Sequence, residues 1–182
     1  YAGAGGSVDP RASAEAIRDQ VARCREVITK MQAGAQAAAA AHAETRLDAA
    51  VERAVETWRA AHPDVAVVVR ADADGALVPL PASEIEAALC ALLDNALHAS
   101  PEAPIEVVAR RAERGSSVSV EDQGPGVAPH LAGRLGEPFL TTKEPGEGMG
   151  LGLFLVRTMV EQVGGPLEVA ARAPRGTRVT LH

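Results

Sequence analysis

A run of glycines at every second position constrains this chain more than any other feature. Residues 146–152 read GEGMGLG, and an apolar stretch with helical spacing, Leu151 to Gln162, overlaps its end. Glycine has no Cβ, so such a run exposes several backbone N–H groups beside the positive end of a helix, an arrangement that binds phosphate. No Gly-Lys pair follows as in a Walker A loop, and Leu151 and Leu153 break the GxGxxG spacing of Rossmann folds.

Composition limits the class of protein further. The 182 residues are 47% hydrophobic and 23% charged, which suits one compact domain plus an appendage. A net charge of −6, no stripe of Lys or Arg, and 2% aromatic residues argue against nucleic acid as a partner. No tract approaches the roughly 20 apolar residues that span a bilayer. The two cysteines have no metal-ligand spacing and no leader-like segment opens the chain, so we expect a cytoplasmic location without membrane contact.

Hydrophobic spacing divides the chain near residue 44. We expect a flexible segment at 1–12, a helix at 13–34, a linker at 35–43 and the main domain at 44–182. The helix carries apolar residues at intervals of 4, 3, 4 and 3, the seam of a helix that packs lengthwise on another helix. These seam residues are Ile17, Val21, Cys24, Ile28 and Met31.

The main domain alternates between helical and extended patterns. Ser83 and Glu86 form the pattern of a capping box before the second of its helices. The last four strands are expected to pair as two hairpins. The order of these expected helices and strands predicts an α/β fold, a two-layer sandwich of a mixed sheet with helices on one face. Helices are expected at 47–62, 83–100, 129–135 and 151–162, and strands at 65–70, 76–80, 104–111, 117–122, 167–171 and 177–181.

Polar residues stand out in two of these segments. Asn95 and His98 lie three residues apart on an apolar helix and share a face. An amide oxygen suits Mg²⁺ that also binds nucleotide phosphates, although an isolated Asn is more often an exposed residue of a helix flank. Asp122 opens the sequence DQGPG after a strand, where its carboxylate can accept a hydrogen bond from an amine such as that of adenine. Alone, this pattern is more often an ordinary turn.

In their order, four segments resemble the N, G1, F and G2 boxes of the ATP-binding domain of sensor histidine kinases, in the GHKL (Bergerat) superfamily. The resemblance covers about residues 47–181 and implies the Bergerat ATP-binding fold. It also implies transfer of the γ-phosphoryl group of ATP to a histidine, for relay to a response regulator. The four segments read LLDNALHAS at 92–100, DQGPG at 122–126, EPFLTTK at 137–143 and GEGMGLGL at 146–153.

The resemblance implies a role for each segment. Asn95 would bind Mg²⁺, His98 would contact phosphate, and Lys143 would join them as a catalytic candidate. Asp122 would accept a hydrogen bond from adenine in a purine pocket shaped by Gly124 and Gly126 and supported by Thr177. The mobile lid and phosphate cradle would comprise Phe139, Thr141, Thr142, Lys143, Gly146, Gly148, Met149, Gly150, Leu151 and Gly152.

Two departures from the family pattern bear on activity. Ala91 stands where the family usually has a polar residue, one helical turn before Asn95. A nucleotide-binding regulatory module, or a catalytically impaired one, is therefore the alternative reading. No histidine lies in a phosphoacceptor box, so we expect no efficient autophosphorylation by this chain alone. Residues 13–31 look like the second helix of a dimerisation hairpin, which implies a homodimer of a larger sensor kinase, one whose signal the sequence does not disclose.

Three short stretches, 21–26, 134–139 and 148–154, look most like the RegB/PrrB-type redox-responsive kinases. This resemblance makes Cys24 a redox candidate. It would lie near its twin if two seam helices paired in parallel, and Arg23 and Arg25 would favour its thiolate. The alternative is a small apolar residue of the seam. We expect Cys90 to belong to the core.

Overall fold

The computed structural model describes residues 44–111, 115–128, 131, 133–141 and 150–182. The chain divides into two units, residues 1–40 and residues 41–182, and all of the described residues belong to the second. The predicted helix at 13–34, with Cys24, therefore lies outside the described residues.

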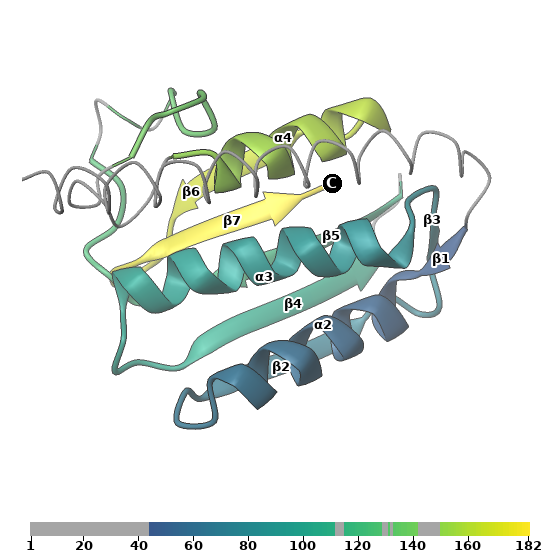
Figure 1. The fold of residues 1–182 in the computed structure, drawn as a ribbon, viewed down its shortest axis with the longest axis horizontal. Helices are drawn as coiled ribbons and strands as arrows, with labels where there is room; N and C mark the ends of the chain where they lie inside the picture. Colours follow the sequence, from purple (N-terminus) through teal and green to yellow (C-terminus); the bar gives the residue numbers. More distant parts are fainter. Residues whose placement is uncertain (1–43, 112–114, 129–130, 132, 142–149) are drawn as a thin grey trace, which may run out of the picture. The chain divides into compact units, whose positions relative to one another are not determined.

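Three helices cover one face of a five-stranded sheet in the described part of the chain (Figure 1). The strand order is β2-β4-β5-β7-β6, with β2 parallel to β4 and the other neighbours antiparallel. The predicted two-layer α/β sandwich with a mixed sheet is confirmed. The elements are β1 (Thr45–Arg46), α2 (Leu47–Ala61), β2 (Val67–Asp72), β3 (Leu77–Val78), α3 (Ala82–Ala99), β4 (Ile105–Arg111), β5 (Ser116–Glu121), α4 (Gly152–Gln162), β6 (Leu167–Ala171) and β7 (Thr177–Leu181).

The core lies between the helices and the sheet, and α3 packs between α2 and α4. The spacing of apolar residues explains which side of each element is buried. Helical residues three or four positions apart share a face, and every second residue of a strand points to the same face of the sheet. Trp58 of α2 is buried, and its Nε1 donates a hydrogen bond of 2.7 Å to Oδ1 of Asp94 on α3. No described helix is both long and apolar enough to cross a lipid bilayer. The largest fully buried side chains are Val51, Val55, Leu89, Leu92, Leu93, Ile105, Val107 and Val160.

Both predicted hairpins are confirmed. Arg111 pairs with Ser116 at the turn between β4 and β5, and Ala171 pairs with Thr177 at the turn between β6 and β7. The sequence did not predict that β7 also pairs with β5, which places the second hairpin beside the end of β5. This pairing brings residues near 122 and 177 together.

Two helix predictions are wrong in detail. The capping box does not form, because α3 already begins at Ala82 and Ser83 lies inside its first turn. Glu86 instead accepts a hydrogen bond of 2.9 Å from Nε of Arg53 on α2. The described residues of 129–135 form turns rather than a helix. Directly after this segment, Gly136 has φ +84°, a left-handed conformation that a right-handed helix cannot continue through.

Two strand predictions also need correction. β2 runs from Val67 to Asp72, beyond the predicted end at residue 70, because its parallel register with β4 continues to the pair Asp72 and Arg110. Within the predicted strand 76–80, only Leu77–Val78 is extended, and it pairs with β1 outside the main sheet.

Candidate nucleotide-binding site

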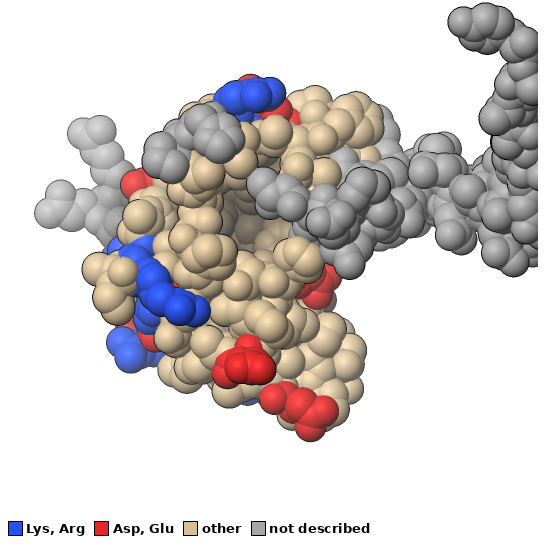
Figure 2. All heavy atoms as spheres, turned by 90° about the vertical axis from the view of Figure 1, so that its left-hand side faces the viewer, with Lys and Arg blue, Asp and Glu red and all other residues tan. Residues whose placement is uncertain are grey.

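Several predicted site residues lie where the C-terminal end of α3, the end of β5 and the start of α4 approach one another. These ends lie on the left-hand side of Figure 1. Figure 2 faces that side and shows a hollowed surface, bordered mostly by residues that are neither acidic nor basic. A hollow with few charged side chains at its border suits a flat aromatic ligand such as a purine.

Asp122 is held in a fixed orientation just beyond the end of β5. It is 7% exposed, and its Oδ1 accepts hydrogen bonds from the backbone N–H groups of Gly124, at 2.7 Å, and Thr177, at 3.2 Å. Its own backbone N–H donates to the carbonyl of Thr177 at 2.9 Å. No described residue donates to Oδ2. One carboxylate oxygen is thus fixed by the protein, and the other remains for a ligand donor.

Close backbone approaches build the surroundings of Asp122. A Cβ on Gly124 would lie 2.6 Å from the carbonyl oxygen of Ala99, so only glycine lets this loop touch the end of α3. Gly176 has φ +117°, and a Cβ there would lie 2.0 Å from the carbonyl oxygen of Asp122. Gly126, with φ +82°, also requires the freedom of glycine.

Sequence reasoning missed Gly176 and Ser100. The Ser100 hydroxyl accepts a hydrogen bond from the backbone N–H of Gln123 and donates to the carbonyl of Ala96, both at 3.3 Å. It therefore ties the loop after β5 to the last turn of α3. The sequence offered one clue to Gly176, which is that it directly precedes the candidate Thr177. Only the pairing of β7 with β5 shows that Gly176 lies against Asp122.

Asn95 and His98 lie on α3, half-buried and exposed respectively. Ala91 marks the side of α3 that faces α4, because a Cβ on Gly152 would lie 4.0 Å from the Ala91 Cβ. Asn95 follows one turn later on that side. The N-box side of α3 and the end of the glycine run are therefore adjacent.

The start of α4 has the features of an anion site. The helix begins at Gly152, the side chain of its N-cap residue Leu151 makes no capping hydrogen bond, and its first turn contains no acidic residue. The N-cap side chain thus satisfies none of the first N–H groups, and the helix dipole favours negative charge there. Gly150 has φ +66°, and a Cβ there would lie 2.5 Å from the carbonyl oxygen of Leu140. The backbone on either side of the lid segment is therefore in direct contact.

The remaining predicted residues of the lid divide into two groups. Phe139 is 73% exposed with φ 65°, Thr141 is exposed, and Leu151 is half-buried. The others lie outside the described residues, so their predicted roles stay predictions. They are Thr142, Lys143, Gly146, Gly148 and Met149.

The chemistry of the described residues suits magnesium that arrives with a nucleotide. They contain no cluster of three or more His, Cys, Asp or Glu side chains able to hold a metal ion. Mg²⁺ in nucleotide sites commonly takes one or two protein oxygens, with phosphate oxygens and water completing its six ligands. The half-buried amide of Asn95 beside the uncapped start of α4 fits that pattern.

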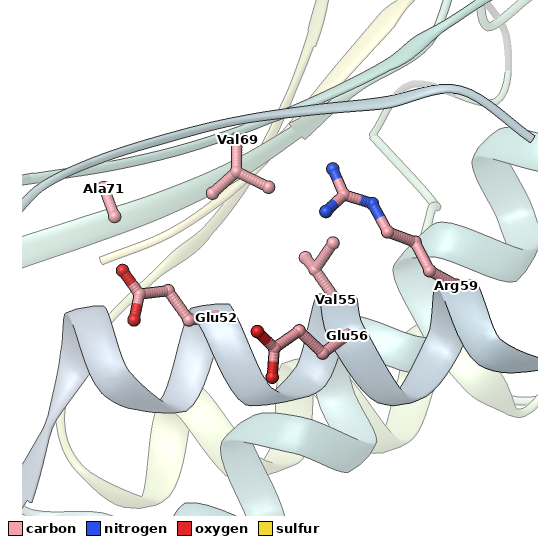
Figure 3. A pocket seen from close by; sticks show the side chains of 6 residues that line it. All are labelled: Glu52, Val55, Glu56, Arg59, Val69 and Ala71. Carbon is pink, nitrogen blue, oxygen red and sulfur yellow. The ribbon is translucent and has the colours of Figure 1, made fainter.

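A second cavity lies between α2 and the edge strand β2, and it has a volume of about 280 Å³ (Figure 3). None of the predicted nucleotide-binding residues lines it. Arg59 partly covers it and donates a hydrogen bond to the carbonyl of Val67. A guanidinium group that binds an outward-facing carbonyl of an edge strand shields that edge from pairing with another chain. This is a structural role for Arg59. The lining residues are Glu52, Val55, Glu56, Arg59, Val69 and Ala71.

Sequence comparison relates the chain to known proteins. Residues 82–182 match the family described as histidine kinase-, DNA gyrase B-, and HSP90-like ATPase. The C4-dicarboxylate transport sensor protein DctB of Pseudomonas aeruginosa is 30% identical over 180 residues. These residues are 96% of this chain but 29% of DctB, so the chain spans less than a third of that relative's length.

Solved structures of histidine kinases are similar to this chain as well. The mycobacterial sensor histidine kinase MprB has a TM-score of 0.67 at 28% identity, over 76% of this chain and 94% of that chain. The ATP-binding domain of PrrB from Mycobacterium tuberculosis has a TM-score of 0.64 over 78% of this chain and 95% of that chain. At 19% identity it shows the fold alone, so the narrower resemblance to RegB/PrrB-type kinases stays a prediction. The chain belongs to the family of histidine kinase-, DNA gyrase B- and HSP90-like ATPases, as the ATP-binding catalytic domain of a two-component sensor histidine kinase.

Proposed function

We propose that this chain binds ATP with Mg²⁺ in the hollow between α3, the end of β5 and the start of α4. The observation that carries the proposal is the carboxylate of Asp122, which two backbone N–H groups hold through Oδ1. Its Oδ2 can accept from the exocyclic amine of adenine, whereas the carbonyl of guanine or hypoxanthine at the same ring position would be repelled. The site therefore selects adenine.

The phosphate end of the nucleotide lies toward α4. The start of this helix at Gly152, shortly after Gly150, supports binding of a triphosphate through backbone N–H groups. Asn95 would supply an amide oxygen to Mg²⁺, and the bound ion would neutralise phosphate charge. His98 and Lys143 are the further phosphate contacts that the family resemblance implies.

The proposed reaction is phosphoryl transfer to a histidine outside this chain. A lone pair of the acceptor imidazole forms the new N–P bond, and the bond between the γ-phosphorus and the bridging oxygen breaks. ADP leaves, and the imidazole releases its proton to solvent. Protein groups contribute mainly by positioning and by neutralising charge. A response regulator then takes the phosphoryl group, in a sensor kinase that dimerises through the segment containing residues 13–31.

A transfer assay tests the proposal. The chain is mixed with labelled ATP, Mg²⁺ and a separate fragment that carries an acceptor-histidine helix, and acid-labile label on the fragment is measured. We expect transfer by the unmodified chain and a strong loss for Asp122→Asn and Asn95→Ala. Calorimetric titration without saturable binding of ATP would overturn the proposal. Binding without transfer to any acceptor fragment would favour the regulatory alternative.

A further inference from the structure

A set of ion-paired side chains lies on the face of the sheet that is turned away from the helices, next to Asp122 in the chain. Neighbouring residues of a strand point to opposite faces, and Val118 and Val120 of β5 face the helices, so Glu121 faces away from them. The Glu121 side chain is 9% exposed. Its Oε1 accepts from Nε of Arg178 at 2.7 Å, and its Oε2 accepts from Nε of Arg172 at 2.9 Å.

Arg172 joins three parts of the sheet. Besides Glu121 on β5, it reaches Glu106 on β4, whose Oε1 accepts from Nη2 of Arg172 at 2.6 Å. Arg172 itself directly follows β6, and its backbone N–H donates to the carbonyl of Gly176 at 3.0 Å. One residue thus closes the turn between β6 and β7 and fastens that turn to two other strands.

This turn carries groups that hold Asp122. Gly176 lies against the Asp122 carbonyl, and Thr177 directs its N–H to Oδ1 of Asp122. Nε of Arg175 adds a hydrogen bond of 2.6 Å to the carbonyl of Gln123. If the turn shifts, Oδ1 loses one of its two donors, and the carboxylate gains freedom to rotate away from the purine.

We infer that Arg172 is a positioning residue that sets the preference of the site for adenine, acting through the β6–β7 turn and Asp122. The inference rests on the proposed ATP site. Arg172 does not touch the nucleotide, since its side chain binds carboxylates on the opposite face of the sheet. Its planar fork binds two separate carboxylates at once, which the single ammonium group of Lys cannot do in the same geometry.

Nucleotide preference provides the test. Calorimetry on the full chain with Mg²⁺ gives the Kd of ATP and of ITP, which has a carbonyl in place of the exocyclic amine. We expect Arg172→Gln to weaken ATP binding by about tenfold, the size expected for one hydrogen bond to a charged group, and to leave ITP binding unchanged. Arg172→Lys should lie in between. The matched control Arg53→Gln removes the exposed pair with Glu86, at 2.9 Å, and should not change the ratio.

A double variant separates positioning from general destabilisation. In an Asp122→Asn background, Arg172→Gln should leave the ATP-to-ITP ratio where Asp122→Asn put it. Equal losses for both nucleotides, an unchanged ratio, or a further fall in the double variant would overturn the inference. If melting without nucleotide shows that Arg172→Gln does not fold, Glu106→Gln replaces it, because it removes only one partner of Arg172. Wild-type chain that binds neither nucleotide would overturn the proposed function instead.

Discussion

Gly152, the first residue of α4, lies directly against Ala91 of α3, and a Cβ built on the glycine would be 4.0 Å from that of the alanine. Ala91 is the position where sensor histidine kinases usually carry a polar side chain. Any side chain longer than alanine there would extend toward the uncapped start of α4, beside the proposed phosphate site. We therefore expect the absence of a polar group at this contact to affect catalysis more than nucleotide binding.

Ala91→Asn should therefore raise the rate of phosphoryl transfer while ATP affinity stays nearly constant. An Asn amide does not transfer protons, but a hydrogen bond that it makes only in the transition state contributes about 100-fold or more, and we expect at least about tenfold here. Single-turnover transfer to an acceptor fragment measures the rate. Ala91→Leu has a similar volume without polarity and should give no increase. Equal rates for the unmodified chain and Ala91→Asn would show that this position does not limit the reaction, whereas transfer only by Ala91→Asn would identify the unmodified chain as an impaired form.

Gly124→Ala should lower both stability and ATP affinity. The new Cβ would lie 2.6 Å from a backbone oxygen of Ala99, which no flexible side chain can relieve. Overpacking of this kind costs about 1–3 kcal/mol, and the displaced loop carries one of the donors to Asp122. Urea unfolding and the rise in Tm with Mg-ATP measure the two effects.

Gly133→Ala is the matched control, since no atom of the described residues lies within 4 Å of a Cβ built there. Its free energy of unfolding should stay within about 0.5 kcal/mol of wild type. Equal behaviour of the two variants would contradict the close packing of Gly124 on α3.

Local patterns predicted the parts of the fold that depend on nearby residues. The spacing of Leu47, Val51, Val55 and Trp58 predicted α2, and the two hairpins followed from short turns between strands. The start of α4 followed from the glycine run. Each of these predictions needs only the geometry of adjacent residues, and the structure confirms all of them.

Contacts between distant residues could not be predicted in this way. Arg172 and Glu106 are 66 residues apart. They meet because β7 pairs with β5, which in turn pairs with β4, so that the β6–β7 turn lies beside both strands. The approach of Gly176 to Asp122 has the same origin. Such contacts depend on the register of three strands at once, and no local pattern of residue types contains that information. Asp122, by contrast, was a candidate from its own motif, although its two backbone donors were not.

Acid should remove the stabilisation that Glu121 provides. Burial alone would raise the pKa of Glu121, but hydrogen bonds and charges from Arg178 and Arg172 lower it below its ordinary value of 4.5. The folded protein therefore binds this proton less readily than the unfolded chain. The stabilisation is present above about pH 4.5 and is lost as pH falls through the lower, folded pKa.

The free energy of unfolding of wild type and Glu121→Gln, measured by urea titration between about pH 6 and pH 3, checks this expectation. The advantage of wild type should be constant at the upper end and should shrink toward the lower end. A difference that does not depend on pH, or that grows in acid, would contradict the ion-paired state of Glu121.

The two cysteines should respond differently to oxidant. Burial, followed by the negative charges of Asp94 and Glu86, raises the pKa of the Cys90 thiol, so little reactive thiolate forms at neutral pH. Cys24 lies outside the described residues, and its predicted seam position between Arg23 and Arg25 favours the thiolate. We expect an oxidant-dependent disulfide dimer on non-reducing electrophoresis for wild type and for Cys90→Ser, but not for Cys24→Ser. A dimer that persists in Cys24→Ser, or no dimer in any of the three proteins, would end the redox role of Cys24.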